Sequence, residues 1–220
     1  MIPELVPYAH HGYIIASIQY RVSGEALFPA QIEDVKTAIR FLRAHAEKYH
    51  IDAERIGIMG ESAGGHLAAL AGTTGNVKEL DKGEWLEQSS KVQAVVDWYG
   101  PTDFLQLSQF SDSVIKNLAA SPEALLIGGR AQDNKEKSEK ANPISYITGE
   151  TPPFLILHGD SDRIVPFSQS EILYEALKGI GADVALYNLE GAGHATKEFF
   201  QPEIENIIIN FFDRHLKKGT

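Results

Sequence analysis

The sequence predicts an α/β fold in which a mostly parallel β-sheet is covered by helices on both faces. Short apolar runs rich in β-branched residues alternate along the chain with longer runs whose apolar residues recur at helical spacing. A repeated order of strand and helix places parallel strands side by side, with the connecting helices packed on the sheet. Polar, glycine-containing segments follow several of these runs. Such segments are expected at the carboxyl ends of the strands, where α/β sheets bind their ligands.

The first half of the chain predicts a long helix with one strand before it and one strand after it. Apolar residues recur every three or four positions from Ile32 to Leu42, which is typical of an amphipathic helix. The expected elements are the end of a helix closed by Gly12, a strand at 13–20, a loop at 21–29, a helix at 30–49, a strand at 55–59, a helix after Ser62 and an irregular segment at 73–91.

The second half predicts three more strands and one insertion. Residues 103–145 lack a strong strand but are too many for a plain loop, so they are expected to form an inserted helical cap with a short helix near 121–127. The remaining expected elements are strands at 92–99, 154–158 and 184–189 and helices at 168–178 and 197–215. We therefore expect one domain over residues 1–220, with the cap at about 103–146.

Composition narrows the class of protein. The formal net charge of −10 argues against nucleic acid or an anionic membrane surface as the main partner. The chain has no cysteine, and no pair of histidines has metal-ligand spacing with a supporting carboxylate, so we expect no cofactor and no metal. Neither a leader peptide nor a spanning segment is evident, which predicts a cytoplasmic protein.

The segment 55–70 carries the strongest chemical signal. Gly60 and Gly64 flank Ser62 as G-x-S-x-G, between an apolar strand-like run and an Ala/Leu-rich helical run. A serine on such a sharp turn exposes its hydroxyl above the strand end, and glycine neighbours let strand and helix approach closely. The turn also places the N–H of Ala63 at the start of a helix, where it could stabilise an oxyanion. The order of elements predicts a nucleophilic serine.

A serine hydroxyl needs a base to remove its proton and an acid to orient that base. His194 lies just past the strand expected at 184–189, and Asp160 and Asp162 lie just past the strand expected at 154–158. The order serine, acid, histidine is the one known for this kind of turn. His66, four residues after Ser62, is interpreted as a packing or hydrogen-bonding residue rather than a second base.

The chain resembles the α/β-hydrolases of the carboxylesterase/lipase type, in the branch of acetyl esterases and feruloyl-type esterases. The resemblance extends from about residue 13 to the C-terminus and is carried, in order, by Gly60-Glu61-Ser62-Ala63-Gly64-Gly65, Tyr99-Gly100-Pro101-Thr102-Asp103, His158-Gly159 with Asp162 and Val165-Pro166, and Gly191-Ala192-Gly193-His194. It implies Ser62 as nucleophile, Asp162 rather than Asp160 as acid, and His194 as general base. The implied activity is a serine carboxylic ester hydrolase acting on short-chain acyl esters, with acetylated or aryl-acylated sugars among the candidates.

One departure from the family pattern concerns the N-terminal part. Members usually carry a His-Gly-Gly-Gly-type loop that completes the oxyanion hole, and this chain has none. By the family layout the chain is N-terminally shortened and begins after the first three strands. In the family's sheet, the third of these strands lies between the strand equivalent to residues 13–20 and the strand equivalent to residues 55–59. An unpaired strand edge invites association, so we expect a homodimer or a strand-swapped oligomer.

Two other functions stay open from the sequence. A serine peptidase of the prolyl-oligopeptidase type shares the expected fold and triad, and a hydrolase-like scaffold without its oxyanion loop would be an inactive binding protein. Glu61, Trp98 and Tyr99 border the serine turn or the neighbouring strand end, which makes them candidates for the substrate pocket. Core packing or loop hydrogen bonding is the preferred interpretation for these three residues.

Overall fold

The structure, a computed structural model, describes residues 5–107 and 121–217. These residues form a four-stranded sheet in the order β1-β2-β3-β4, and every neighbouring pair is parallel. The strands are β1 (Gly57–Glu61), β2 (Ala94–Trp98), β3 (Phe154–Gly159) and β4 (Val184–Leu189). The α/β-hydrolase fold predicted from the sequence is confirmed.

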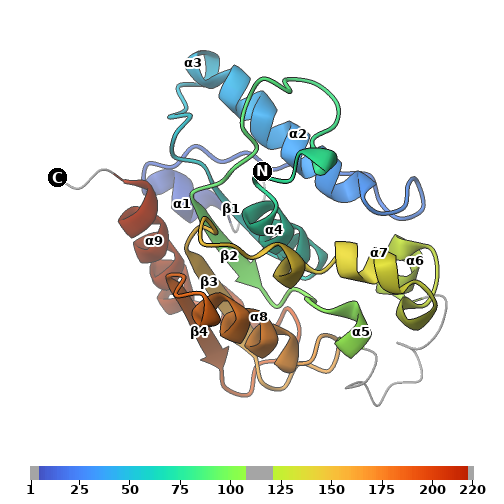
Figure 1. The fold of residues 1–220 in the computed structure, drawn as a ribbon. Coiled ribbons are helices and arrows are strands. Elements are labelled where there is room, and N and C mark those ends of the chain that lie inside the picture. The colour runs from blue at the N-terminus through green and yellow to red at the C-terminus, as the bar shows by residue number, and fades with distance from the viewer. Residues whose placement is uncertain (1–4, 108–120, 218–220) are drawn as a thin grey trace.

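Helices connect the strands and cover both faces of the sheet (Figure 1). The α-helices are α1 (Val6–His10), α2 (Ala30–Ala44), α3 (Ala46–Tyr49), α4 (Ala63–Thr73), α5 (Phe104–Leu107), α6 (Pro122–Ile127), α7 (Lys135–Lys140), α8 (Ser168–Gly179) and α9 (Pro202–Leu216). Short 3-10 helices are η2 (Lys78–Leu80), η4 (Ala131–Asp133), η5 (Pro143–Tyr146) and η6 (Lys197–Phe200). No helix among these residues is both long and apolar enough to cross a membrane.

Strand alternation divides the core into two layers. On one face, Val95 and Ile156 pack with buried residues of α2, α4 and α8. On the other face, Val96 and Leu157 pack with residues of α1 and α9. Successive side chains of a strand point to opposite faces, so β2 and β3, buried along their whole length, supply both layers.

The prediction of a strand at residues 13–20 is wrong. These residues belong to no strand, and residues 14–20 form no backbone–backbone hydrogen bond with the part of the chain that the structure describes. A β-strand exists only where a neighbour accepts and donates its backbone hydrogen bonds. Among the described residues β1 pairs with β2, and a hollow lies between its other edge and residues 14–18. The segment therefore forms no strand in spite of its β-branched composition.

A hollow of about 370 Å³ lies along the free edge of β1. Ile56 accepts from Gln93 and Ser62 donates to the carbonyl of Trp98. Because backbone groups alternate in direction along a strand, those of Gly57, Met59 and Glu61 point away from β2, towards this edge. The hollow is lined largely by apolar residues.

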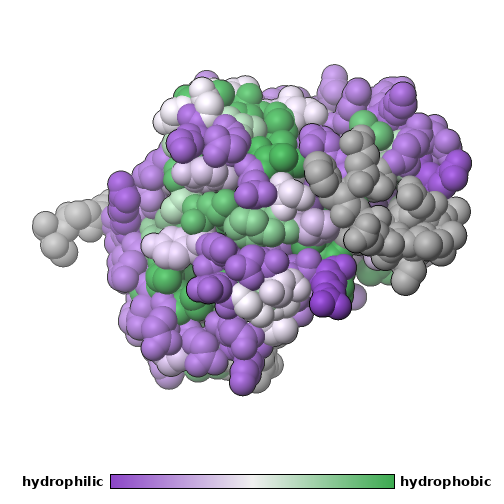
Figure 2. All heavy atoms as spheres, turned by 90° about the horizontal axis from the view of Figure 1, so that it is seen from below, coloured by the Kyte–Doolittle hydropathy of each residue, from purple (hydrophilic) through white to green (hydrophobic). Residues whose placement is uncertain are grey.

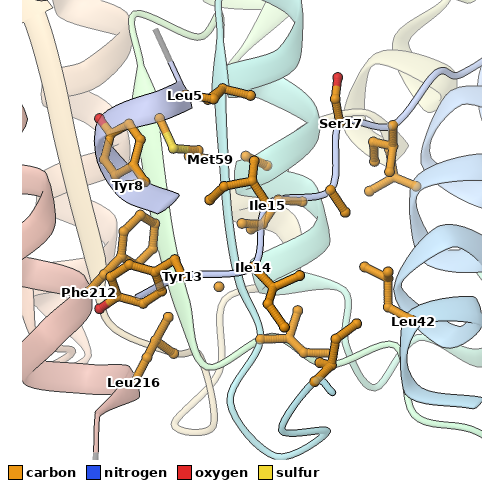
Figure 3. A pocket seen from close by; sticks show the side chains of 18 of the residues that line it. Leu5, Tyr8, Tyr13, Ile14, Ile15, Ser17, Leu42, Met59, Phe212 and Leu216 are labelled. Carbon is orange, nitrogen blue, oxygen red and sulfur yellow. The ribbon is translucent and has the colours of Figure 1, made fainter. Parts of the chain in front are cut away.

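Residues from several elements meet in this hollow (Figure 3). Ile14 and Ile15 project into it between Tyr13 and Phe212 on one side and Leu42 of α2 on the other. Ile14 is 57% exposed and Ile15 39% exposed, which is unusual for isoleucines beside a sheet. The gap predicted between segment 13–20 and the serine strand is thus present, and no new strand pairing closes it within the described residues.

The insertion expected between β2 and β3 is helical where it is described. It contains α5, α6, η4, α7 and η5, and α6 begins at the predicted place, because the side chain of Ser121 accepts a hydrogen bond from the N–H of Ala124 as an N-cap. Residues 108–120 of the predicted cap lie outside the described part of the chain.

A buried charge cluster fastens α2 to the segment after α4. Asp81 lies 3.2 Å from the Lys36 ammonium and 3.0 Å from the Arg40 guanidinium, and both cationic side chains are fully buried. Burial lowers the pKa of Lys36. Burial would by itself raise the pKa of Asp81, but hydrogen bonds from Ser90 and Lys36 hold it below its usual range. The carboxylate therefore stays charged between its partners.

Replacing Asp81 by alanine should destabilise the fold by about 3 kcal/mol, because it leaves two buried cations without a counterion. Urea denaturation monitored by circular dichroism measures the change. The matched control is Asp133→Ala, which breaks an exposed ion pair with Arg130 and should leave the midpoint nearly unchanged. Equal midpoints for wild type and Asp81→Ala would contradict the prediction.

Candidate active site

Ser62 occupies a strained turn between β1 and α4. Its backbone has φ 53° and ψ −115°, a conformation that a residue with a side chain rarely adopts. Its N–H donates to the carbonyl of Trp98 over 2.9 Å, and its carbonyl accepts from the N–H of His66 over 3.0 Å, the first hydrogen bond of α4. The turn is therefore fixed both to β2 and to the helix.

The glycines around Ser62 are required by close contact. A Cβ on Gly60 would collide with the backbone carbonyl of Gly64, and one on Gly65 would collide with the side chain of Asp97 and lie 2.8 Å from the carbonyl of Trp98. Helix α4 therefore approaches both strands more closely than any side chain would permit. The close packing of α4 against β1 and β2 therefore explains the glycines of the G-x-S-x-G-G pattern.

His194 joins Ser62 to an aspartate. Its Nε2 lies 3.0 Å from the Ser62 hydroxyl oxygen, and its Nδ1 lies 2.6 Å from Oδ2 of Asp162. A carboxylate only accepts hydrogen bonds, so Nδ1 carries the proton and Nε2 is free to accept from the serine hydroxyl. The structure thus brings together the three side chains that the sequence singled out, in an arrangement suited to proton transfer from serine to histidine.

Asp162 is held in its ionised form. Its side chain is fully buried, and Oδ1 accepts from the N–H groups of Ile164 and Val165 over 2.7 and 2.9 Å. Burial alone would raise the pKa of Asp162, but hydrogen bonds from His158, His194 and these backbone groups hold it well below its usual range. The carboxylate can therefore orient and charge-balance the imidazole at neutral pH.

Asp160, the rival acid, lies elsewhere. It is exposed and accepts hydrogen bonds from the N–H of Gly191 over 2.8 Å and from the side chain of Asn188 over 3.3 Å. It therefore connects the loop after β3 to the loop that carries His194, and contacts neither ring nitrogen of His194.

Two other histidines support the site from within the core. His66 is buried, with its Nδ1 2.8 Å from the carbonyl of Pro101, and burial lowers its pKa to about 4. It is therefore neutral and cannot act as a charged group beside the serine. His158 places Nδ1 2.7 Å from the Ser170 hydroxyl and Nε2 2.9 Å from the carbonyl of Val165, which braces the turn containing Asp162.

Sequence reasoning missed Asp97. This residue of β2 is fully buried, and its Oδ1 accepts from the N–H of Gly100 over 2.9 Å while lying against Gly65 of the serine turn. Burial raises its pKa to about 6. An acidic residue inside the apolar run that ends at Trp98 was the available signal, because a buried carboxylate needs a structural or chemical reason.

The site lies at the carboxyl ends of β1, β3 and β4, the edge predicted from the strand order. The strands run towards the viewer of Figure 2, where hydrophobic residues form a band across the middle of this face between hydrophilic surroundings.

Ala63 follows Ser62 as the first residue of α4, so its N–H is one of the N–H groups that have no acceptor inside the helix. No cluster of three or more metal-ligating side chains occurs in the described ranges.

Comparison with known proteins identifies esterase relatives. The BD-FAE family model matches residues 2–177. The chain is 37% identical over 185 residues to the esterase LipQ of Mycobacterium tuberculosis, covering 84% of this chain and 43% of LipQ. It is 35% identical over 191 residues to the esterase LipC of the same organism, covering 84% of this chain and 46% of LipC. The chain therefore spans less than half the length of these curated relatives.

Solved structures agree in fold. A truncated form of a carbohydrate esterase from gut microbiota superposes with a TM-score of 0.85 at 38% identity, over 92% of this chain and 74% of that chain. Esterase 2 of the planctomycete Thermogutta terrifontis superposes with a TM-score of 0.72 at 24% identity, over 99% of this chain and 78% of that chain, a likeness of fold alone.

The two aspartates give a test of the geometry. Asp162→Asn should lower kcat for ester hydrolysis by about 10⁴-fold at neutral pH, because an amide in this place favours the wrong tautomer of His194. Asp160→Asn retains an acceptor for the Gly191 N–H and should lower kcat by less than about tenfold. Steady-state rates for both variants measure the difference. A larger loss in Asp160→Asn would contradict the assignment.

Asp162→Asn should also change how the stability of the protein depends on pH. Because the fold lowers the pKa of Asp162, its ionised carboxylate stabilises the protein above the ordinary aspartate pKa of about 4 and loses that contribution as the pH falls further. The difference in unfolding free energy between wild type and Asp162→Asn should therefore shrink in acid.

Proposed function

Because the chain belongs to the BD-FAE family, we propose that it is a serine carboxylic ester hydrolase whose nucleophile, acid and general base are Ser62, Asp162 and His194. The observation that carries the proposal is the continuous hydrogen-bonded line from the Ser62 hydroxyl through His194 to the buried Asp162 carboxylate.

The proposed reaction has two half-reactions. The Ser62 oxygen attacks the ester carbonyl carbon while its proton passes to Nε2 of His194. The N–H of Ala63 stabilises the resulting oxyanion, and the carbon–oxygen bond to the alcohol breaks as the alcohol takes the proton from His194. Water then attacks the acyl-serine and gives a proton to His194. The bond between the acyl carbon and the Ser62 oxygen breaks, the Ser62 oxygen takes the proton back from His194, and the carboxylic acid leaves. Asp162 remains ionised throughout and balances the imidazolium charge.

Short acyl esters of sugars are the proposed substrate class. The support is the 38% identity to a carbohydrate esterase over most of this chain. A 42% identity to a bifunctional GH43-CE protein of Bacteroides eggerthii, over 90% of this chain and 29% of that one, agrees. We also propose that the helices between β2 and β3 cap the site and shape access to it.

The remaining predictions on partners and location stay proposals. The net charge of −10 supports a small-molecule partner rather than nucleic acid or an anionic membrane surface, and a cytoplasmic location stays a prediction. For association, we propose that a second copy of this chain packs at the free edge of β1. The outward-pointing backbone groups of Gly57, Met59 and Glu61 and the exposed Ile14 and Ile15 support it.

Replacing Ser62 by alanine should reduce hydrolysis of p-nitrophenyl acetate, butyrate and acetylated xylo-oligosaccharides to background, because it removes the oxygen that forms the proposed acyl-enzyme. Ser89→Ala, which removes an exposed hydroxyl that accepts from the N–H of Lys91 before β2, should retain wild-type rates. Full turnover by Ser62→Ala would contradict the mechanism. A wild type inert towards all esters would favour a binding scaffold, and cleavage of a proline-containing amide in preference to esters would favour a peptidase.

Replacing Ile15 by lysine should shift the protein from dimer to monomer, because a charge at the free edge of β1 opposes pairing with another chain. Light scattering after size-exclusion chromatography at several concentrations measures the mass. Ile180→Lys places the same charge on an isoleucine of similar exposure, 44%, and should leave the dimer intact. A monomeric wild type at all concentrations would exclude association through this edge.

A further inference from the structure

Tyr99 connects the base of the proposed site to the residue that precedes the nucleophile. Its ring lies 4.7 Å from the His194 ring, centroid to centroid, at an interplanar angle of 62°. Its hydroxyl donates to Oε2 of Glu61 over 2.9 Å. Glu61 is the last residue of β1 and directly precedes Ser62. One side chain therefore contacts both the histidine and the strand that presents the serine.

Tyr99 has a strained backbone conformation that its contacts hold in place. Its backbone has φ 42°, a left-handed conformation that favours glycine. Its N–H donates to the carbonyl of Leu157 over 2.9 Å, and the Phe199 ring packs edge-on at 4.6 Å. The side chain is fully buried. A tyrosine in a conformation that glycine would adopt freely indicates that its side chain supplies contacts the site needs.

The hydrogen bond to Asp162 does not by itself fix the plane of the His194 imidazole. It holds Nδ1 in place, but rotation about the side-chain torsions can still tilt the ring and move Nε2. A ring packed against the imidazole restricts that rotation, and so keeps Nε2 aimed at the serine oxygen. Tyr99 is the aromatic residue with the shortest centroid distance to His194 among the described ring contacts.

Glu61 fixes the other end of the tyrosine. Burial, and then the neighbouring carboxylate, raise the pKa of Tyr99, so the phenol keeps its proton and its O–H donates a hydrogen bond to Glu61. A hydrogen bond from a neutral donor to an ionised acceptor is stronger than one between neutral groups. Movement of the tyrosine away from His194 would therefore break a charge-assisted hydrogen bond.

We propose that Tyr99 is a positioning residue that sets the plane of the His194 imidazole relative to Ser62, and that Glu61 anchors it. This inference rests on the proposed function. It assigns no proton transfer to either residue: Tyr99 acts through His194, and Glu61 acts through Tyr99. Their effect falls on the formation of the covalent bond at Ser62 rather than on the binding of substrate.

A double-mutant cycle tests the inference. Tyr99→Phe keeps the ring and removes the hydroxyl, and Glu61→Ala removes the acceptor. Each should lower kcat by about tenfold with KM little changed, as expected for loss of one hydrogen bond to a charged group. The double variant should lose no more than either single variant, because both remove the same link. Glu61→Gln keeps an acceptor oxygen and should recover part of the loss.

The rate of Ser62 phosphorylation by diisopropyl fluorophosphate, followed by mass spectrometry, separates this inference from the proposed function. The reaction needs the serine and histidine in register but no particular ester, so the same tenfold slowing is expected in each variant. Tyr13→Phe is the matched control, since it removes a tyrosine–carboxylate hydrogen bond of 2.6 Å to Asp213, whose neighbour Phe212 packs against the first residue of β1. It should react at the wild-type rate.

The outcomes are distinct. A wild type that the reagent does not label at Ser62 would overturn the proposed function, and the inference with it. A labelled wild type with Tyr99→Phe reacting equally fast would overturn the inference alone. Additive losses in the double variant would show that Tyr99 and Glu61 act separately, which also overturns it. Slower labelling with non-additive losses supports it.

Discussion

The close approach of α4 to β1 and β2 is the constraint on which the site depends. Only glycine at positions 60 and 65 permits the approach, because a Cβ at either would meet the backbone carbonyl of Gly64 or the side chain of Asp97. The approach forces Ser62 into a left-handed backbone conformation, and the hydrogen bond from its N–H to Trp98 keeps it there. The strain is offset by packing in the two layers of the core, which are complete on both faces of β2 and β3.

Most of the fold could be predicted from the sequence because each strand and the loop that follows it are recognisable from neighbouring residues. Buried parallel strands read as apolar runs, and each is followed by the loop that carries a polar side chain to the same edge of the sheet. The strand order also predicted that Ser62, Asp162 and His194 would lie close together, and the structure brings these side chains into contact. Choosing between Asp160 and Asp162 needed the resemblance to a family, since both follow the same strand.

What the sequence could not predict depended on neighbours. Residues 13–20 have the composition of a strand, but a hollow lies between residues 14–18 and the free edge of β1, so the backbone hydrogen bonds of a strand are not formed there. Asp97 and Tyr99 owe their places to contacts with Gly65, Glu61 and His194, which are distant in sequence or differ in element. Spacing along one chain carries no record of such contacts.

The bond between Asp160 and the Gly191 N–H, together with that from the Ser161 N–H to the carbonyl of Ala192, ties the β3 and β4 loops into a single unit. The proposed acid and base, Asp162 and His194, therefore lie on two connected loops, whereas the proposed nucleophile, Ser62, lies at the end of β1. The helical insertion after β2 lies between β1 and these loops in the chain. With the proposed capping role, changes in that insertion would alter which substrates enter the site while Asp162 and His194 stay hydrogen-bonded, so specificity could diversify without a change in the chemistry.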